Sequence, residues 1–419
     1  MRMLARGLTA AVTLIASAAA LPAATAQTTH PTPRPERSAL APLHRAINAV
    51  PDQYIVTLDN GMDPSSFAQQ FGVAPMFHYT KVFSGFASTF TAAQLDAVRR
   101  TPGVAAVEQN ATVTADDLGG TTTRHTTAAR TPTTVHPGAG LRGSRAAAAS
   151  WGLDRIDQRN LPLDNQFSTI GEGQGATAYV LDTGIDYGHS EFGGRAVPGY
   201  DAIGDGRNGA DCEGHGTHVA GTIGGATYGI ARKATLVSVR VLDCQGEGSL
   251  AGIIAGMDWV AQNAHQPAVA NASLGGSYSP ALNDAADALS DSGVLPVVAA
   301  GNDGADACNV SPASAPRVLT IGATDRTDHE ASYSNSGSCV SMFAPGTSIV
   351  SAKLGGGSVA LSGTSMASPH AAGTALLYKA EHPDADAVSV ADALSANATQ
   401  NVLTVNGGSP NLLVYTGGL

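Results

Sequence analysis

Short apolar segments alternate with helical segments over the C-terminal two thirds of the chain, and this alternation restricts the fold more than any other feature. The apolar segments are rich in β-forming residues and lie at 178–181, 236–242, 269–274, 294–300 and 318–321. A helix is indicated between the segments 236–242 and 269–274, because apolar residues recur there at helical spacing. They are Leu250, Ile253, Ile254, Met257 and Val260. Strands of this kind, separated by helices, are typical of a parallel sheet covered on both sides. The sequence therefore predicts an α/β domain over 150–419.

A second pattern precedes this domain. A strand at 54–58 and a short helix at 65–71 are followed by two strands within 77–90. A capping box at Thr91-Ala92-Ala93-Gln94 starts a helix that ends at Pro102-Gly103, and a last strand follows at 105–113. The order β-α-β-β-α-β predicts a small ferredoxin-like α+β domain over 51–117. We expect a flexible lead-in at 27–50 and an exposed linker at 118–149, because both segments are rich in Thr and Ala.

The first 26 residues have the pattern of a secretory signal peptide. Arg2 and Arg6 precede an apolar stretch at 8–21, which ends near the small residues Ala24-Thr25-Ala26. Fourteen apolar residues are fewer than the roughly 20 that a membrane-spanning helix needs. No other stretch is long and apolar enough to span a bilayer. We therefore expect a secreted, extracellular protein with no membrane partner.

The charge is distributed unevenly between the two parts of the chain. The net charge of −11 combines +4 for residues 1–147 with −15 for residues 148–419. Such an acidic larger part disfavours binding to phosphate backbones, so we expect no nucleic-acid partner. With 43% hydrophobic and 14% charged residues, the composition excludes a disordered chain and a coiled coil. We expect a monomer.

Four cysteines lie in the acidic part, and none belongs to a C-x-x-C pair of the zinc-binding type. An oxidising compartment favours disulfides, and four cysteines permit three pairings. Pairing in chain order would close loops of 32 and 31 residues. The cysteines are Cys212, Cys244, Cys308 and Cys339.

Three segments carry the residues needed for acyl transfer. Asp182 ends an apolar strand, His215 opens a Gly-rich helix, and Ser365 opens another helix. A serine is a weak nucleophile until a base takes its proton, and the base needs a carboxylate to hold its tautomer. A serine at a helix start also has a backbone N–H where negative charge would develop. Together the three residues predict a nucleophilic serine with its base and orienting acid.

Two other chemistries fit parts of the same sequence. Asp182-Thr183-Gly184 and Asp291-Ser292-Gly293 have the form of the paired loops of an aspartic protease. That class needs a sheet-rich bilobal fold, whereas this chain alternates strand and helix. His215 and His218 have the spacing of metal ligands on one helix face, but no H-E-x-x-H pattern accompanies them. Both alternatives are disfavoured.

In the order Asp182, His215 and Ser365, with their flanking glycines, the three segments resemble those of the subtilisin-like serine proteases. The segment at 151–158 is similar to the mature start of the proteinase K-like branch. The resemblance implies a secreted serine endopeptidase that cleaves proteins and peptides, with broad specificity for large apolar residues. The domain at 51–117 would then be an inhibitory propeptide, with a processing site in the linker 118–149. The alternative is a catalytically silent secreted binding protein on the same fold.

The same resemblance implies roles for further residues. Asn302 would supply the amide of the oxyanion hole, and disulfides would join Cys212 to Cys244 and Cys308 to Cys339. Two edges would hold the substrate backbone as an added strand, which the glycines among them would allow to approach closely. The edge and pocket residues are Gly246, Gly248, Ser273, Leu274, Gly275, Gly276, Ala299, Ala300 and Gly301.

A structural calcium ion is expected at the start of the α/β domain. Asp154, Asp157, Gln158 and Asp164 crowd eleven residues around Pro162 and all present oxygen ligands. Calcium takes six to eight oxygens in a flexible geometry, which suits this set better than it suits magnesium. The resemblance supports the expectation, because proteinase K-like bacterial enzymes bind calcium at this segment.

Overall fold

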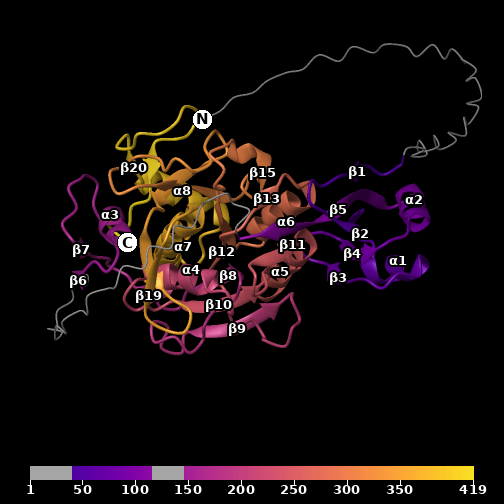
Figure 1. Ribbon diagram of the computed structural model, residues 1–419, viewed down its shortest axis with the longest axis horizontal. Coiled ribbons are helices and arrows are strands. Elements are labelled where there is room, and N and C mark those ends of the chain that lie inside the picture. The colour runs from indigo at the N-terminus through magenta and orange to yellow at the C-terminus, as the bar shows by residue number, and fades with distance from the viewer. Residues whose placement is uncertain (1–39, 116–145) are drawn as a thin grey trace, which may run out of the picture. The chain divides into compact units, whose positions relative to one another are not determined.

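The computed structural model describes residues 40–115 and 146–419, and Figure 1 shows how their helices and strands are arranged. The expected signal peptide, most of the lead-in and most of the linker lie outside the described residues. Within the described part of the chain, no helix is long and apolar enough to cross a membrane.

The smaller domain has the predicted ferredoxin-like order, in which two helices pack on one face of a sheet that is antiparallel except for the pairing of β1 with β5. Its sheet has the strand order β1-β5-β2-β4-β3. Phe67 and Val98 of the helices pack with Val56 and Phe86 of the sheet in one apolar cluster. Thr91 and Gln94 form the predicted capping box. The elements are β1 Leu43–His44, β2 Ala49–Leu58, α1 Pro64–Gln70, β3 Phe77–Tyr79, β4 Gly85–Thr89, α2 Ala92–Arg100 and β5 Val104–Thr114.

The end of the expected lead-in is part of this domain. Strand β1 pairs in parallel with β5, matching Leu43 to Val107, and the Val107 N–H donates to the carbonyl of Pro42 at 3.0 Å. Residues 49 and 50 already belong to β2. The boundary at residue 50 is therefore wrong for the described residues 40–50. The apolar residues among them do not alternate with polar ones, and Pro42 interrupts them, so the sequence offered no periodic signal for a strand.

The larger domain is a parallel sheet with helices on both faces, as predicted. Its main sheet has the strand order β20-β21-β17-β16-β14-β12-β8-β10-β9, in which every neighbouring pair except β20 and β21 is parallel. The strands of this sheet are β8 Thr177–Asp182, β9 Ala196–Asp201, β10 Thr235–Arg240, β12 Ala268–Ala272, β14 Leu295–Ala299, β16 Leu319–Thr324, β17 Met342–Pro345, β20 Thr399–Gln400 and β21 Leu412–Leu413.

Alternate residues of the central strand β8 face two different apolar clusters. Val180 belongs to the cluster that includes residues of α4, α7 and α8, whereas Tyr179 and Leu181 belong to the cluster with α5 and α6. The second cluster also includes residues of the smaller domain, so the two domains share one apolar cluster. These residues are Ile55, Tyr79, Val82, Ala87, Ala111 and Val113. The helices are α3 Trp151–Ile156, α4 His215–Gly224, α5 Leu250–Asn263, α6 Pro280–Asp291, α7 Thr364–Glu381 and α8 Ala387–Asn397.

The five strands predicted for this domain correspond to β8, β10, β12, β14 and β16. Edge strand β9 was missed because Pro198 and Gly199 interrupt its apolar pattern, and both residues are tolerated near a sheet edge. Short strands outside the main sheet are β6 Ala146–Ala147, β7 Gln166–Phe167, β11 Glu247–Ser249, β13 Gly276–Ser277, β15 Val310–Ser311, β18 Ile349–Ala352 and β19 Ser358–Leu361.

Both disulfides implied by the resemblance are present. Cys212 is bonded to Cys244, and Cys308 is bonded to Cys339. The first joins the loop before α4 to the loop before β11, so it ties together two segments that flank His215.

Candidate active site

The predicted catalytic residues gather at one edge of the main sheet. Asp182 is the last residue of β8, and Asn302 follows β14, which ends at Ala299. Ser273 directly follows β12. Carboxyl ends of parallel strands meet at the same edge, so these residues come together although they are far apart in the sequence.

The carboxylate of Asp182 holds the imidazole of His215. The His215 Nδ1 lies 2.8 Å from the Asp182 Oδ1, which also accepts the Thr183 N–H at 2.7 Å. The Asp182 side chain is 0% exposed and that of His215 is 14% exposed. The second oxygen of Asp182 has no hydrogen-bond partner within the described residues. A buried carboxylate here favours the Nδ1–H tautomer, which presents Nε2 as a proton acceptor.

The surroundings of His215 make it a stronger base than an ordinary histidine. Burial lowers the pKa of its imidazole, but the charge and hydrogen bond of Asp182, with the charges of Glu213 and Asp211, outweigh burial and raise the pKa from 6.5 to about 9. Glu213 also holds the backbone, since its Oε2 accepts the His215 N–H at 2.7 Å. The charged imidazole that would form during proton transfer is therefore stabilised.

Ser365 lies in the first turn of α7, where a proline shapes its contacts. Its hydroxyl donates to the carbonyl of Ser273 at 3.1 Å. Pro369 lies four residues later and has no N–H, so it cannot make the usual helical bond to the Ser365 carbonyl. The hydroxyl of Ser273 replaces that bond at 2.9 Å. Ser273 thus anchors the serine of α7 to the end of β12.

Two hydrogen-bond donors lie beside the start of α7. The Asn302 Oδ1 accepts the Thr364 N–H at 2.8 Å and its hydroxyl at 2.9 Å, which orients the amide group of Asn302. A Cβ added to Gly363 would lie 3.5 Å from the Asn302 Nδ2 and 3.7 Å from the Ser365 N. Both nitrogens therefore border one space next to the serine. This arrangement suits an oxyanion hole.

The end of the smaller domain occupies the cleft in front of these residues. Strand β5 pairs antiparallel with β11, placing Val113 opposite Gly248 and Thr114 opposite Glu247. The Ala115 N–H then donates to the Gly246 carbonyl at 2.8 Å. Gly246 and Gly248 thus hold an added strand, in the manner that the resemblance implied.

The second proposed edge lies on the other side of this strand. A Cβ on Gly276 would lie 3.3 Å from a methyl carbon of Val113, so Gly276 is against the occupying strand. Ser273, Leu274 and Gly275 are buried between β12 and Gly276. Ser273 bonds Ser365, as described above, while Leu274 packs in the apolar cluster below the cleft.

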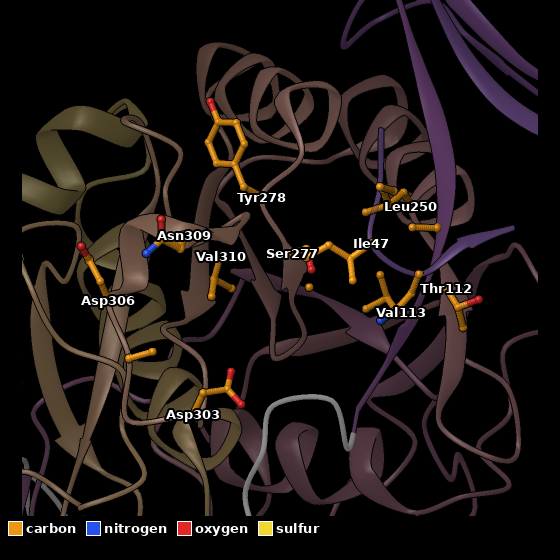
Figure 2. Close-up of a pocket in the computed structure, with 15 residues that line it drawn as sticks. Ile47, Thr112, Val113, Leu250, Ser277, Tyr278, Asp303, Asp306, Asn309 and Val310 are labelled. Carbon is orange, nitrogen blue, oxygen red and sulfur yellow. The ribbon is translucent and has the colours of Figure 1, made fainter. Parts of the chain in front are cut away.

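Two cavities flank the occupying strand. One, of about 290 Å³, is lined by His215, Gly246, Leu354 and Ala115, among others. The other, of about 320 Å³, is shown in Figure 2, with Ile47 and Thr112 from the smaller domain and Tyr278 and Val310 from the larger one. Together they leave space along the cleft on either side of the bound strand.

The expected pocket residues 299–301 do not line either of these cavities. Ala299 and Ala300 are fully buried. Gly301 has a φ of 105°, and a Cβ there would lie 2.2 Å from the Asn335 Nδ2, so glycine is required. Its N–H donates to the Thr364 hydroxyl at 3.2 Å. These residues shape the wall behind Asn302.

Polar contacts between the two domains were not found from the sequence. The Asp258 Oδ1, on a side chain that is almost fully buried in α5, accepts the backbone N–H groups of Thr80, Lys81 and Val82 at 2.9, 2.6 and 3.0 Å. In the reverse direction, the Glu108 carboxylate accepts the Ala281 N–H of α6 at 3.0 Å. Asp258 interrupts an apolar helix face, which is a signal that could have identified it.

Three of the four candidate calcium ligands, Asp154, Asp157 and Asp164, lie near enough for their charges to interact, whereas the Gln158 side chain bonds the following turn. The two carboxylate oxygens of Asp154 accept the N–H groups of Asp164 and Asn165 at 3.2 and 2.8 Å. The Gln158 amide nitrogen donates to the Pro162 carbonyl at 2.9 Å. Burial and the charges of Asp154 and Asp164 raise the pKa of Asp157 to about 6. They outweigh the hydrogen bonds from Ser168, which lower it. No group of three acidic, histidine or cysteine side chains in the described residues is close enough to hold a metal ion without rearrangement.

The structure supports neither the aspartic-protease alternative nor the metal-ligand alternative. Asp291 forms an ion pair with Arg317 at the end of α6, whereas Asp182 bonds His215. The His218 Nε2 contacts the carbonyls of Ile349 and Val359 at 3.0 and 3.2 Å, and burial lowers its pKa to about 3. His218 is thus a neutral residue that holds two strands.

Comparison with known proteins assigns both parts of the chain to families. The family model of the subtilase family matches residues 173–415, and that of the peptidase inhibitor I9 family matches residues 53–116. Alkaline serine exoprotease A of Vibrio alginolyticus is 46% identical over 80% of this chain and 58% of its own length. The extracellular serine proteinase of Thermus sp. (strain Rt41A) is 55% identical over 64% of this chain and 66% of its own length.

A solved structure extends the comparison to the fold. A cold adapted subtilisin-like serine proteinase superposes with a TM-score of 0.64 at 51% sequence identity, over 65% of this chain and 99% of that one. This chain spans about three fifths to two thirds of the length of the Vibrio and Thermus relatives.

Proposed function

The chain belongs to the subtilase family, and we propose on that basis that it is a secreted serine endopeptidase made as an inactive precursor. The observation that carries the proposal is the 2.8 Å contact between Asp182 and His215 at the sheet edge where Ser365 and Asn302 also lie. The names of the Vibrio and Thermus relatives, an exoprotease and an extracellular proteinase, support secretion.

Each residue has a defined role in the proposed reaction. The Ser365 hydroxyl turns from the Ser273 carbonyl to the Nε2 of His215, which takes its proton as the oxygen attacks the peptide carbonyl. Asp182 holds the imidazole and stabilises its charged form. The Asn302 amide and the Ser365 N–H stabilise the oxyanion. His215 then gives the proton to the leaving amine, and water releases the acyl group by the reverse sequence.

The smaller domain inhibits this site by binding as a substrate would. Its strand β5 pairs with β11, and its last described residue, Ala115, reaches the cavity that His215 lines. The contacts of Asp258 and Glu108 across the domain interface hold it there. The precursor is released from inhibition when the chain is cut beyond Ala115 and the domain is removed.

We expect broad cleavage after large apolar residues, since Gly276, Leu250 and Val310 line the cavity beside the occupying strand, whereas residues 299–301 lie behind Asn302 and do not line it. Casein hydrolysis blocked by a serine-directed fluorophosphonate tests the activity, and a peptide-library digest tests the preference. A strict preference for Arg or Lys would contradict the proposed preference for large apolar residues. Absence of hydrolysis by the processed protein would favour the alternative, a catalytically silent binding protein.

The activity of the processed enzyme is expected to increase with pH above the pKa of an ordinary histidine. The base must be neutral to take the Ser365 proton, and the pKa of His215 is raised from 6.5 to about 9. The fraction of neutral imidazole therefore increases as the pH rises through that range. The kcat/KM of the processed enzyme, measured from pH 5 to 10, should show one rising limb with its midpoint above 6.5. A midpoint at or below 6.5 would contradict the account.

We also propose that a structural calcium ion binds at the turn after α3. Asp154, Asp157, Gln158 and Asp164 would hold it with carboxylate and amide oxygens. The donor set supplies three carboxylates at one turn, where burial above all, and then the charges of Asp154 and Asp164, raise the pKa of Asp157 to about 6. The ion would pin the first helix of the larger domain to the following loop.

Removal of calcium is expected to lower the melting temperature. An ion at 100 times its dissociation constant stabilises a fold by about 2.7 kcal/mol. Differential scanning calorimetry with calcium and with EDTA measures the difference for an inactivated enzyme that cannot digest itself. Asp157→Ala should remove most of that difference, while Asp392→Ala, a change at an exposed position of α8, should retain it. An unchanged EDTA effect in Asp157→Ala would place the ion elsewhere.

A further inference from the structure

A buried carboxylate that the proposed reaction does not use lies four residues before His215. Asp211 is 8% exposed. Its Oδ1 accepts hydrogen bonds from the Thr183 hydroxyl at 2.9 Å and from the N–H groups of Glu213 and Gly214, both at 3.0 Å. Thr183 directly follows Asp182, so one carboxylate oxygen joins the end of β8 to the loop that leads into α4.

The second oxygen of Asp211 holds the first turn of α4. It accepts the Thr217 N–H at 3.0 Å and the Thr217 hydroxyl at 2.5 Å. The Thr183 hydroxyl completes the connection, because it accepts the Gly216 N–H at 3.0 Å. The donors to Asp211 thus lie on both sides of His215 in the sequence and on the residue next to Asp182.

The contact between Asp182 and His215 depends on how two separate elements are placed. The residues are 33 positions apart, with Asp182 at the end of a sheet strand and His215 at the start of a helix. Hydrogen bonds to a buried carboxylate are stronger than neutral ones, and the loss of several at once frees the segments they join. A misplacement of about 1 Å in a catalytic group can reduce the rate about 100-fold.

We propose that Asp211 is a positioning residue, which sets His215 against Asp182 by binding both the end of β8 and the start of α4. The inference rests on the proposed function. It adds a residue that touches neither the substrate nor the reacting atoms. The proposal rests on the five hydrogen bonds that the Asp211 carboxylate accepts. No motif in the sequence predicted them.

The charge of Asp211 also gives a measurable signature. The charged groups that act on His215 are Asp182 on β8 and Glu213 and Asp211 in the loop, and the buried His218 follows on α4. Asp211 is one of the groups that raise the pKa of His215. Replacement by asparagine removes that charge, so the midpoint of the rising limb should move to lower pH. Unfolding of a fraction of the molecules would lower the activity per mole of protein without moving this midpoint.

The test compares Asp211→Asn, Thr183→Val and the control Asp325→Asn with the wild type. Asp325 holds an exposed turn through the N–H groups of Thr327 and His329 and contacts none of the residues above. Each full-length precursor is processed by affinity-tagged wild-type enzyme, which is then removed. A Ser365→Ala precursor treated in the same way measures any activity carried over. Active sites are titrated with a fluorophosphonate, and kcat and KM are measured from pH 5 to 10.

For Asp211→Asn we expect a kcat per active site about 10–100-fold lower, a KM within about twofold of the wild type, and a lower pH midpoint. Thr183→Val keeps the charge of Asp211 and should lower kcat about tenfold with a smaller shift of the midpoint than Asp211→Asn, and it serves alone if Asp211→Asn does not fold. Asp325→Asn should match the wild type. Wild-type kcat in both Asp211→Asn and Thr183→Val would overturn the inference, whereas an inactive wild type would overturn the proposed function instead.

Discussion

Replacement of Ser365 by alanine is expected to lower turnover by about 10⁶-fold, the magnitude measured for the nucleophile of subtilisin itself. The side chain is buried at the start of α7 and small, so the substitution leaves the helix and its contacts in place. The loss would therefore come from the missing nucleophile rather than from unfolding. Hydrolysis of a peptide substrate per mole of folded protein measures it.

The same variant is expected to remain an unprocessed precursor. The tail of the smaller domain lies in the cleft of its own chain, so the first cut needs an active serine. Secreted Ser365→Ala, produced without added protease, should retain the chain upstream of residue 116 as judged by N-terminal sequencing. Normal maturation of this variant would show that another protease performs the cleavage.

Replacement of Asn302 by alanine is expected to lower kcat by about 10²–10³ with little change in KM. This is the magnitude known for the oxyanion-hole amide of subtilisin, and the reason is that the donor acts mainly on charge that develops in the transition state. The orientation of Asn302 by the two donors of Thr364 fixes the amide before the reaction begins. Steady-state kinetics with a chromogenic peptide gives both constants.

Asn309→Ala provides the matched control, because Asn309 lies on the cleft wall in Figure 2 and has no contact with Thr364. Its kcat should stay within about twofold of the wild type, as for an ordinary surface substitution. A large rise in KM at unchanged kcat in Asn302→Ala would mean that Asn302 binds the ground state, and its assignment to the oxyanion hole would then be wrong.

The fold was predictable, and the candidate catalytic residues could be chosen, because their signals are local. The alternation of strands and helices depends on the residues within each element, and it correctly placed the carboxyl end of β8 at Asp182. Asp182, His215 and Ser365 each lie in a short segment whose neighbours are distinctive. Asn302 and the disulfides came from the resemblance, since nothing in their spacing alone assigns them.

The residues that the sequence did not reveal act through contacts between distant segments. Asp211 binds Thr183, which is 28 positions away, and Asp258 binds the turn at Lys81, which is 177 positions away. Neither partner can be chosen before the sheet brings the segments together. The strand β1 was missed for the same reason, because its partner β5 supplies the ordering that its own residues lack.

Chemical labelling of the processed enzyme tests the central claim most directly. A fluorophosphonate reacts with a serine whose proton is taken by a neighbouring base, and peptide mass spectrometry identifies the residue that carries it. We expect a single label, on Ser365. The labelled fraction should increase in proportion to the loss of casein hydrolysis, and the labelling reaction should be much slower in His215→Ala. Full hydrolysis with Ser365 unlabelled, or labelling of a different serine, would contradict the account.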